Sequence, residues 1–151
     1  MNDMEELYQS IILEHNRNPQ NFGKLSDATC SAKGYNANCG DDIRLFLKLD
    51  GSVLSDVRFS GEGCAISRAS ASLLTMAVKN ISKDRAVAMA EEMLSLLTGK
   101  SQLMNDLSHL GSRVALLGVR KFPMRIKCAT LPWHALIDAL GEGNVAIRGK
   151  A

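Results

Sequence analysis

A stretch of alternating apolar and polar residues constrains the fold of this chain most. Apolar residues occupy every second position from residue 43 to residue 49, and an Asp50-Gly51 pair follows. Alternation with a period of two is typical of a strand with one buried face, and Asp-Gly is a common hairpin turn. Residues 53–60, with Val57 and Phe59 on one face, predict the returning strand. We therefore expect an antiparallel hairpin.

Most of the remaining apolar patterning is helical, with a spacing of three or four residues. The further elements expected are helices at about 4–16, 65–79, 82–99 and 132–140, short helical pieces at 101–108 and 112–117, and a first strand at 31–34. Pro132 is assigned to the first turn of the last helix, because a proline inside a helix breaks its hydrogen-bond ladder. Grouped strands followed by grouped helices indicate an α+β fold, with an N-terminal helix, a small antiparallel β-sheet packed against helices and a helical C-terminal half.

Length and charge narrow the class of protein. A chain of 151 residues suits a single domain, here spanning 1–151. The net charge of +2 is too small to indicate a nucleic-acid or membrane partner. The first residues are acidic and no segment approaches about 18 consecutive apolar residues, so we expect neither a signal peptide nor a membrane span. We expect a cytoplasmic protein, in which grouped cysteines more often bind metals or catalyse than form disulfides.

A Cys-Gly-Asp sequence, residues 39–41, stands at the start of the hairpin. Gly40 lets the backbone turn so that Cys39 and Asp41 can face one point. Zinc accepts both thiolate and carboxylate ligands, and thiolates also suit iron-sulfur clusters. The alternative is a turn that happens to carry a buried thiol, and the spacing alone does not decide between the two.

A second cysteine, Cys64, follows Gly61-Glu62-Gly63 where the returning strand passes into a helix. A thiol at a helix N-terminus has its pKa lowered by the helix dipole, which favours a reactive or ligating thiolate. The alternative is a small buried residue at a tight joint between strand and helix. Because antiparallel strands bring their outer ends side by side, we expect Cys64 to lie near Cys39.

A third cysteine, Cys128, lies in the basic stretch 125–128, just before the expected last helix. With the two cysteines and the aspartate above, it would complete a tetrahedral site of three sulfurs and one oxygen. Cys30 lacks comparable flanking residues and is expected to be a core or surface thiol. The histidines expected to be structural or exposed to solvent are His15, His109 and His134.

Three separated motifs resemble the IscU/NifU-type iron-sulfur cluster assembly family, and the similarity is greatest to its SufU branch. The motifs are YNANCGD at 35–41, GEGCAISRASAS at 61–72 and RIKCATLPW at 125–133. The resemblance extends over nearly the whole chain and implies a SufE/NifU/IscU-like fold with a metal site at one end. Scaffold members of the IscU branch carry a histidine immediately before the last cysteine. This chain has Lys127 there, which argues against an IscU-like scaffold role.

The SufU resemblance implies a zinc-dependent sulfurtransferase. Such a protein receives persulfide sulfur from a SufS-type cysteine desulfurase and passes it to downstream cluster assembly or acceptor proteins. The resemblance implies Cys39 as the sulfur acceptor and Cys39, Asp41, Cys64 and Cys128 as ligands of Zn²⁺. Arg125 is placed to contact a persulfide or another anion near this site, or else is one solvated cation in a basic stretch.

Two other functions remain open from the sequence. The first is a non-enzymatic scaffold on which a [2Fe-2S] cluster is assembled and transferred, with iron or the cluster held in place of zinc. The second is a structural zinc domain that only docks partner proteins, whose closed thiols would resist alkylation.

Overall fold

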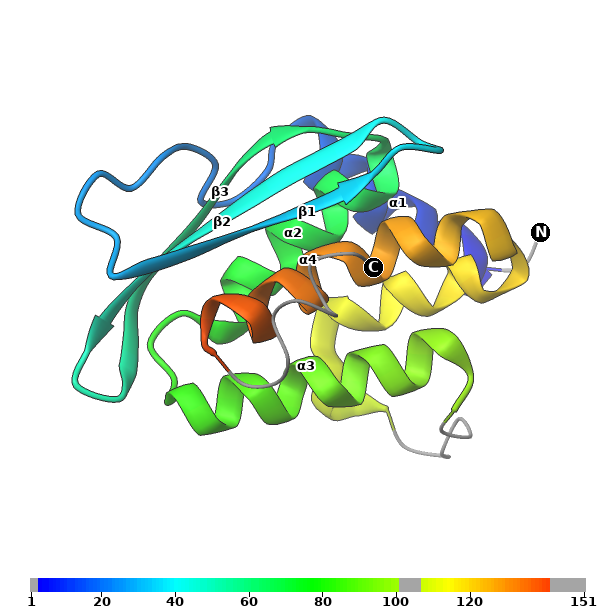
Figure 1. The fold of residues 1–151 in the computed structure, drawn as a ribbon. Helices are drawn as coiled ribbons and strands as arrows, with labels where there is room; N and C mark the ends of the chain where they lie inside the picture. The colour runs from blue at the N-terminus through cyan, green and yellow to red at the C-terminus, as the bar shows by residue number, and fades with distance from the viewer. Residues whose placement is uncertain (1–2, 101–106, 142–151) are drawn as a thin grey trace.

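The computed structural model describes residues 3–100 and 107–141. A three-stranded antiparallel sheet in the order β1-β2-β3 lies against a layer of helices, as Figure 1 shows. The elements are α1 (Asp3–Arg17), β1 (Cys30–Asn36), β2 (Asp41–Asp50), β3 (Val53–Glu62), α2 (Ala65–Val78), α3 (Lys83–Thr98), the 3-10 segment η1 (Ser108–Lys121) and α4 (Pro123–Ala139). The predicted α+β fold is confirmed, although most of the helical piece expected at 101–108 lies outside the described residues.

The predicted hairpin forms β2 and β3 around a turn in which Gly51 has a φ of 63°. On its inner face Ile43, Leu45 and Leu47 are fully buried against the helices, as the alternation predicts. Strand β1 is longer than the sequence indicates and pairs with β2 from Cys30 opposite Leu47 to Asn36 opposite Asp41. The C-terminal end of β1 therefore lies beside the start of β2 at one end of the sheet.

Helix α2 carries only alanine and serine at its buried positions 69–72, which allows close packing there. The Ser70 hydroxyl donates a hydrogen bond to the carbonyl of Ala129 at 2.6 Å and accepts one from Trp133 Nε1 at 3.1 Å. All three residues are buried. This buried pair of hydrogen bonds fixes α2 against α4.

The last helix begins earlier than predicted. Helix α4 starts at Pro123, and Pro132 lies inside it instead of in its first turn. Pro123 suits the first turn, where a backbone N–H has no partner in the helix. Pro132 leaves the carbonyl four residues earlier without its usual donor, and the next carbonyl along is the one that receives the Ser70 hydroxyl. As a result Cys128 lies within the helix and not before it.

The region predicted as a helical piece at 112–117 belongs to the longer 3-10 segment η1. A kink at Gly111, where φ is 57° and ψ is −139°, interrupts this segment. None of the helices in the described ranges is both long and apolar enough to cross a membrane.

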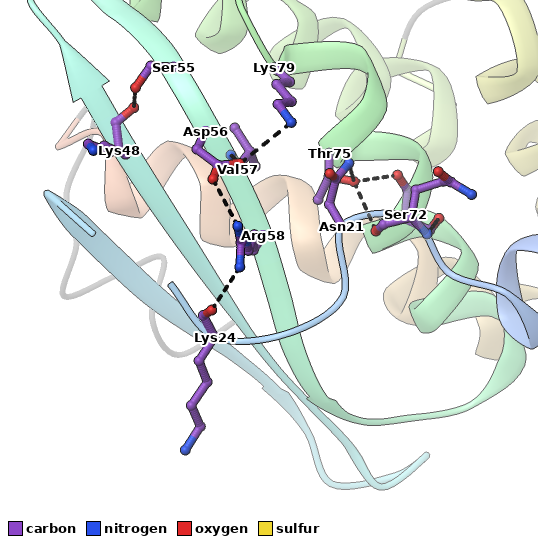
Figure 2. A network of polar contacts seen from close by, with 11 residues as sticks. Asn21, Lys24, Lys48, Ser55, Asp56, Val57, Arg58, Ser72, Thr75 and Lys79 are labelled. Atoms are coloured by element: carbon purple, nitrogen blue, oxygen red, sulfur yellow. Dashed lines mark hydrogen bonds and ion pairs between the residues drawn. The ribbon is translucent and has the colours of Figure 1, made fainter. Parts of the chain in front are cut away.

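Polar contacts fix the segment that joins α1 to β1 (Figure 2). Asn21 Nδ2 donates to Thr75 Oγ1 at 3.0 Å, and Thr75 Oγ1 in turn lies 2.8 Å from the carbonyl of Ser72. Farther along, Arg58 on β3 contacts the Lys24 carbonyl at 3.4 Å. The segment is thereby held against both α2 and β3.

Candidate metal centre

Three side chains converge at the end of the sheet where β1 meets β2. The ligand atoms of Cys39, Asp41 and Cys128 all lie within 4.8 Å of one another. Asp41 and Cys128 are fully buried, whereas Cys39 is half-buried. Thiolate sulfur and carboxylate oxygen are both zinc ligands, so the donor set fits a zinc ion.

Gly40 makes this convergence feasible. Its φ of 69° lies in the left-handed region, and its N–H donates to the carbonyl of Ala37 at 3.3 Å. The chain reverses tightly there, a conformation that favours glycine. Cys39 and Asp41, on either side of it, therefore reach the same site, as the Cys-Gly-Asp spacing predicts.

Cys64 joins the site first through its backbone. It is the N-cap of α2, and its N–H donates a hydrogen bond to Asp41 Oδ1 at 2.9 Å. Its sulfur is not among the three ligand atoms that lie within 4.8 Å of one another. The thiol nevertheless acts on Cys128, whose pKa it helps to raise. The hairpin thus brings Cys64 into contact with Asp41, two positions after Cys39 in the chain.

Two residues that the sequence did not single out hold the Asp41 carboxylate. The buried Ser67 hydroxyl lies 2.9 Å from Asp41 Oδ1 and 3.1 Å from the Cys64 carbonyl. Asn36 Nδ2 lies 3.5 Å from Asp41 Oδ2 and 3.7 Å from Cys128 Sγ. Outer contacts of this kind orient a metal ligand and tune its affinity. The only sequence signal was their presence within the two cysteine motifs.

Gly63, which precedes Cys64, leaves room for the Ser67 hydroxyl. A Cβ at this position would collide with Ser67 Oγ and would lie 3.0 Å from Asp41 Oδ1. Close packing around the Asp41 carboxylate therefore requires a glycine at position 63.

Burial is the main reason that the pKa of the Cys128 thiol lies above its ordinary value, and contacts with Cys39, Asp41 and Cys64 raise it further. A metal ion that binds here must displace the proton of this thiol, so binding releases protons.

Arg125 extends from the first turns of α4 toward Cys39, with Nη1 3.7 Å from Sγ. Its guanidinium is exposed, and its pKa is raised above the ordinary value by Cys128 first, then by Cys64 and Cys39. The direct contact is with Cys39, so the positive charge lies beside the most accessible of the three clustered ligand groups.

Cys30 and the three histidines are not part of the clustered ligand group. Cys30 is half-buried at the start of β1 and packs against the core, as expected. His15 shares a hydrogen bond with Ser72 Oγ at 2.7 Å, and the exposed His109 contacts Glu92 at 2.7 Å. His134 lies on α4 and lines a separate cavity.

The sequence and the fold match a known family. The model of the NifU-like N terminal domain matches residues 7–129. This chain belongs to that family. It is 45% identical over 134 residues to the zinc-dependent sulfurtransferase SufU of Bacillus subtilis, with 89% of each chain covered. It is 37% identical over 140 residues to the iron-sulfur cluster assembly scaffold protein IscU of Streptococcus pyogenes, covering 93% of this chain and 86% of that protein.

A solved structure agrees in fold. The putative iron-sulfur cluster assembly scaffold protein for the SUF system from Fervidobacterium islandicum superposes with a TM-score of 0.81 and 32% identity. The match covers 90% of this chain and 98% of that one. The family and the fold that the three motifs implied are both confirmed.

Proposed function

We propose that this NifU-type protein serves iron-sulfur cluster assembly as a zinc-dependent sulfur acceptor and carrier. The observation that carries the proposal is the group of Cys39, Asp41 and Cys128, whose ligand atoms lie within 4.8 Å of one another. The family match and the 45% identity to a zinc-dependent sulfurtransferase support the choice of zinc and of sulfur transfer.

We assign the metal to Cys39, Asp41, Cys64 and Cys128. Zinc would keep the thiols deprotonated without redox chemistry of its own. Cys64 is included because its backbone binds Asp41 and its thiol acts on the Cys128 pKa. Ser67 and Asn36 orient the carboxylate and keep the site assembled.

Cys39 is the proposed sulfur acceptor because it is more accessible than Cys128 and lies beside Arg125. Its thiolate attacks the outer sulfur of a persulfide on the partner protein. A new sulfur-sulfur bond forms at Cys39, the bond within the partner's persulfide breaks, and the partner keeps a thiolate as leaving group. Arg125 then stabilises the anionic persulfide on Cys39.

The partner that this chemistry requires is a cysteine desulfurase, here of the SufS type, and the sulfur then passes to a downstream assembly or acceptor protein. Both partners are cytoplasmic in this proposal. The test is to purify the protein without added metal and to assay desulfurase turnover with and without it. We expect about one zinc per chain if the proposed site is filled, and stimulation that is lost in Cys39→Ala and retained in Cys30→Ala. Undiminished stimulation by Cys39→Ala would reject Cys39 as the acceptor.

The similarity to IscU proteins favours a second candidate, a scaffold for a [2Fe-2S] cluster. Lys127, which stands where the scaffold branch has a histidine, opposes it. Anaerobic reconstitution with iron and sulfide separates the two functions. A stable visible chromophore that needs Cys39, Cys64 and Cys128 would favour the scaffold, and a colourless zinc protein would favour the carrier.

A further inference from the structure

A cavity of about 730 Å³ opens between the C-terminal end of β1 and one face of α4. Its described walls are residues 35–38, that face of α4 and Thr98 at the end of α3. Cavities of about 300–1,000 Å³ are typical of small-molecule sites. The candidate metal ligands do not line this space, although three residues next to them, Asn36, Asn38 and Lys127, form part of the wall.

The Asn36 side chain connects the cavity to the Cys128 thiol. Asn36 lines the cavity, and the same Asn36 amide lies 3.7 Å from Cys128 Sγ. Asn38 and Lys127, which also line it, immediately precede Cys39 and Cys128 in the chain. The chain positions immediately before Cys39 and Cys128 therefore form part of the cavity wall.

The cavity wall suits an anion with an apolar part. Lys127 and His134 lie two helical turns apart on one face of α4, and no acidic residue is among the described residues of the wall. Apolar side chains, including Ile126 and Leu131, complete the same face. Lys127 is exposed, so its ammonium can reach a ligand carboxylate without leaving a buried environment.

We propose that this cavity binds a small anionic thiol, which takes the sulfane sulfur from persulfidated Cys39. Binding follows from the cavity alone, whereas the transfer step rests on the function proposed above. In that step the thiolate of the small molecule attacks the outer sulfur of the Cys39 persulfide. A sulfur-sulfur bond forms on the small molecule, the one at Cys39 breaks, and Cys39 leaves as a thiolate.

Binding is tested on the full, zinc-loaded chain with S-methylglutathione, an anion that has no free thiol. Titration followed by NMR is expected to shift the amides of residues 35–38 in a saturable manner. Lys127→Gln should raise the dissociation constant about fivefold, the change expected when one exposed ion pair is lost. The matched control Lys24→Gln removes a charge from an exposed lysine that is not among the described residues of the cavity wall and should leave binding unchanged. A blocking variant, Thr98→Trp, places bulk at the exposed end of α3 and should also weaken binding.

Absence of saturable shifts, or equal binding by Lys127→Gln and Lys24→Gln, would overturn the assignment of the cavity. If desulfurase fails to persulfidate Cys39 of the unmodified chain while that chain still binds S-methylglutathione, the proposed function is wrong and the cavity assignment stands.

Transfer is tested on persulfidated protein by measuring the loss of sulfane sulfur as the thiol concentration rises. Glutathione should give a rate that saturates and that falls in Lys127→Gln, whereas the uncharged thiol 2-mercaptoethanol should give a rate that rises linearly. Linear dependence on glutathione, with the same slope in Lys127→Gln and Lys24→Gln, would show that the thiol reacts from solution and would overturn the transfer step.

Discussion

The carboxylate of Asp41 accepts a hydrogen bond from the backbone N–H of Cys64 at 2.9 Å, although 23 positions separate the two residues. This contact joins the start of β2 to the N-terminus of α2. A carboxylate at a helix N-terminus is also stabilised by the helix dipole. The residues proposed to hold the metal are thus positioned by the protein itself.

Ser67→Ala should weaken zinc binding while leaving the fold intact. The substitution removes the hydroxyl that lies 2.9 Å from Asp41 Oδ1, so the carboxylate is less firmly oriented. Loss of such a contact typically lowers metal affinity about 10- to 100-fold. Competition with a zinc chelator measures the change, and Ser31→Ala, on the exposed face of β1, is the matched control. Equal zinc affinity in the two variants would show that Ser67 does not support the ligand.

Gly63→Ala should disturb the same carboxylate by a different route. The added methyl group would collide with the Ser67 hydroxyl and approach Asp41. We expect lower zinc affinity and a loss of unfolding free energy of about 1–3 kcal/mol, the usual cost of overpacking. Gly118→Ala is the control, because a Cβ there meets only Tyr8 at 3.8 Å. Urea denaturation of both variants makes the comparison, and identical midpoints would contradict the packing argument.

Zinc should stabilise the folded protein only when the clustered thiols are present. A ligand that binds the folded state raises the melting temperature by mass action. Cys128→Ser replaces a thiol of the site, whereas Cys30→Ser replaces a half-buried thiol outside it. Thermal denaturation with and without one equivalent of zinc should show a rise in the unmodified chain and in Cys30→Ser, and a much smaller rise in Cys128→Ser. A full rise in Cys128→Ser would remove Cys128 from the ligand set.

His15 should make stability depend on pH. Its pKa is lowered from the ordinary value of 6.5, chiefly because it is partly buried, with Glu14 opposing the shift. The neutral ring can accept the hydroxyl proton of Ser72, whose oxygen already receives the Gln20 N–H at 2.8 Å. The unfolded chain therefore takes up the proton first as pH falls below 6.5, and the free energy of unfolding decreases in that window.

The measurement is urea denaturation at pH 7.5 and pH 5.5, values on either side of the ordinary histidine pKa of about 6.5. The unmodified chain should lose more stability than His15→Gln between the two. His109→Gln serves as control, because His109 is exposed and its contact with Glu92 lies on the surface. An equal loss in all three proteins would mean that other groups cause the pH dependence.

Much of the fold and of the site follows from local sequence. The alternation at 43–49 and the Asp-Gly turn predict the hairpin. Gly40 predicts that the side chains of Cys39 and Asp41 face the same site. These inferences succeed because each depends on backbone conformation set by adjacent residues.

The parts that the sequence did not reveal depend on contacts between distant elements. The prediction that α4 starts at Pro132 is wrong because this proline lies inside a longer helix that packs against α2 and β1, contacts that local sequence does not show. The contacts of Ser67 and Asn36 with Asp41 arise because α2 and β1 both pack around this carboxylate, which local sequence does not indicate. The cavity beside Asn36 likewise arises from the packing of β1 against α4.

The most direct test of the central claim is mass spectrometry of the zinc-loaded protein after incubation with a cysteine desulfurase and cysteine. The proposed function predicts that the peptide containing Cys39 gains the mass of one sulfur atom and loses it again on treatment with a reductant. Peptides containing Cys30 should gain none. A Cys39 peptide of unchanged mass, under conditions in which the desulfurase itself carries persulfide, would contradict sulfur transfer to Cys39.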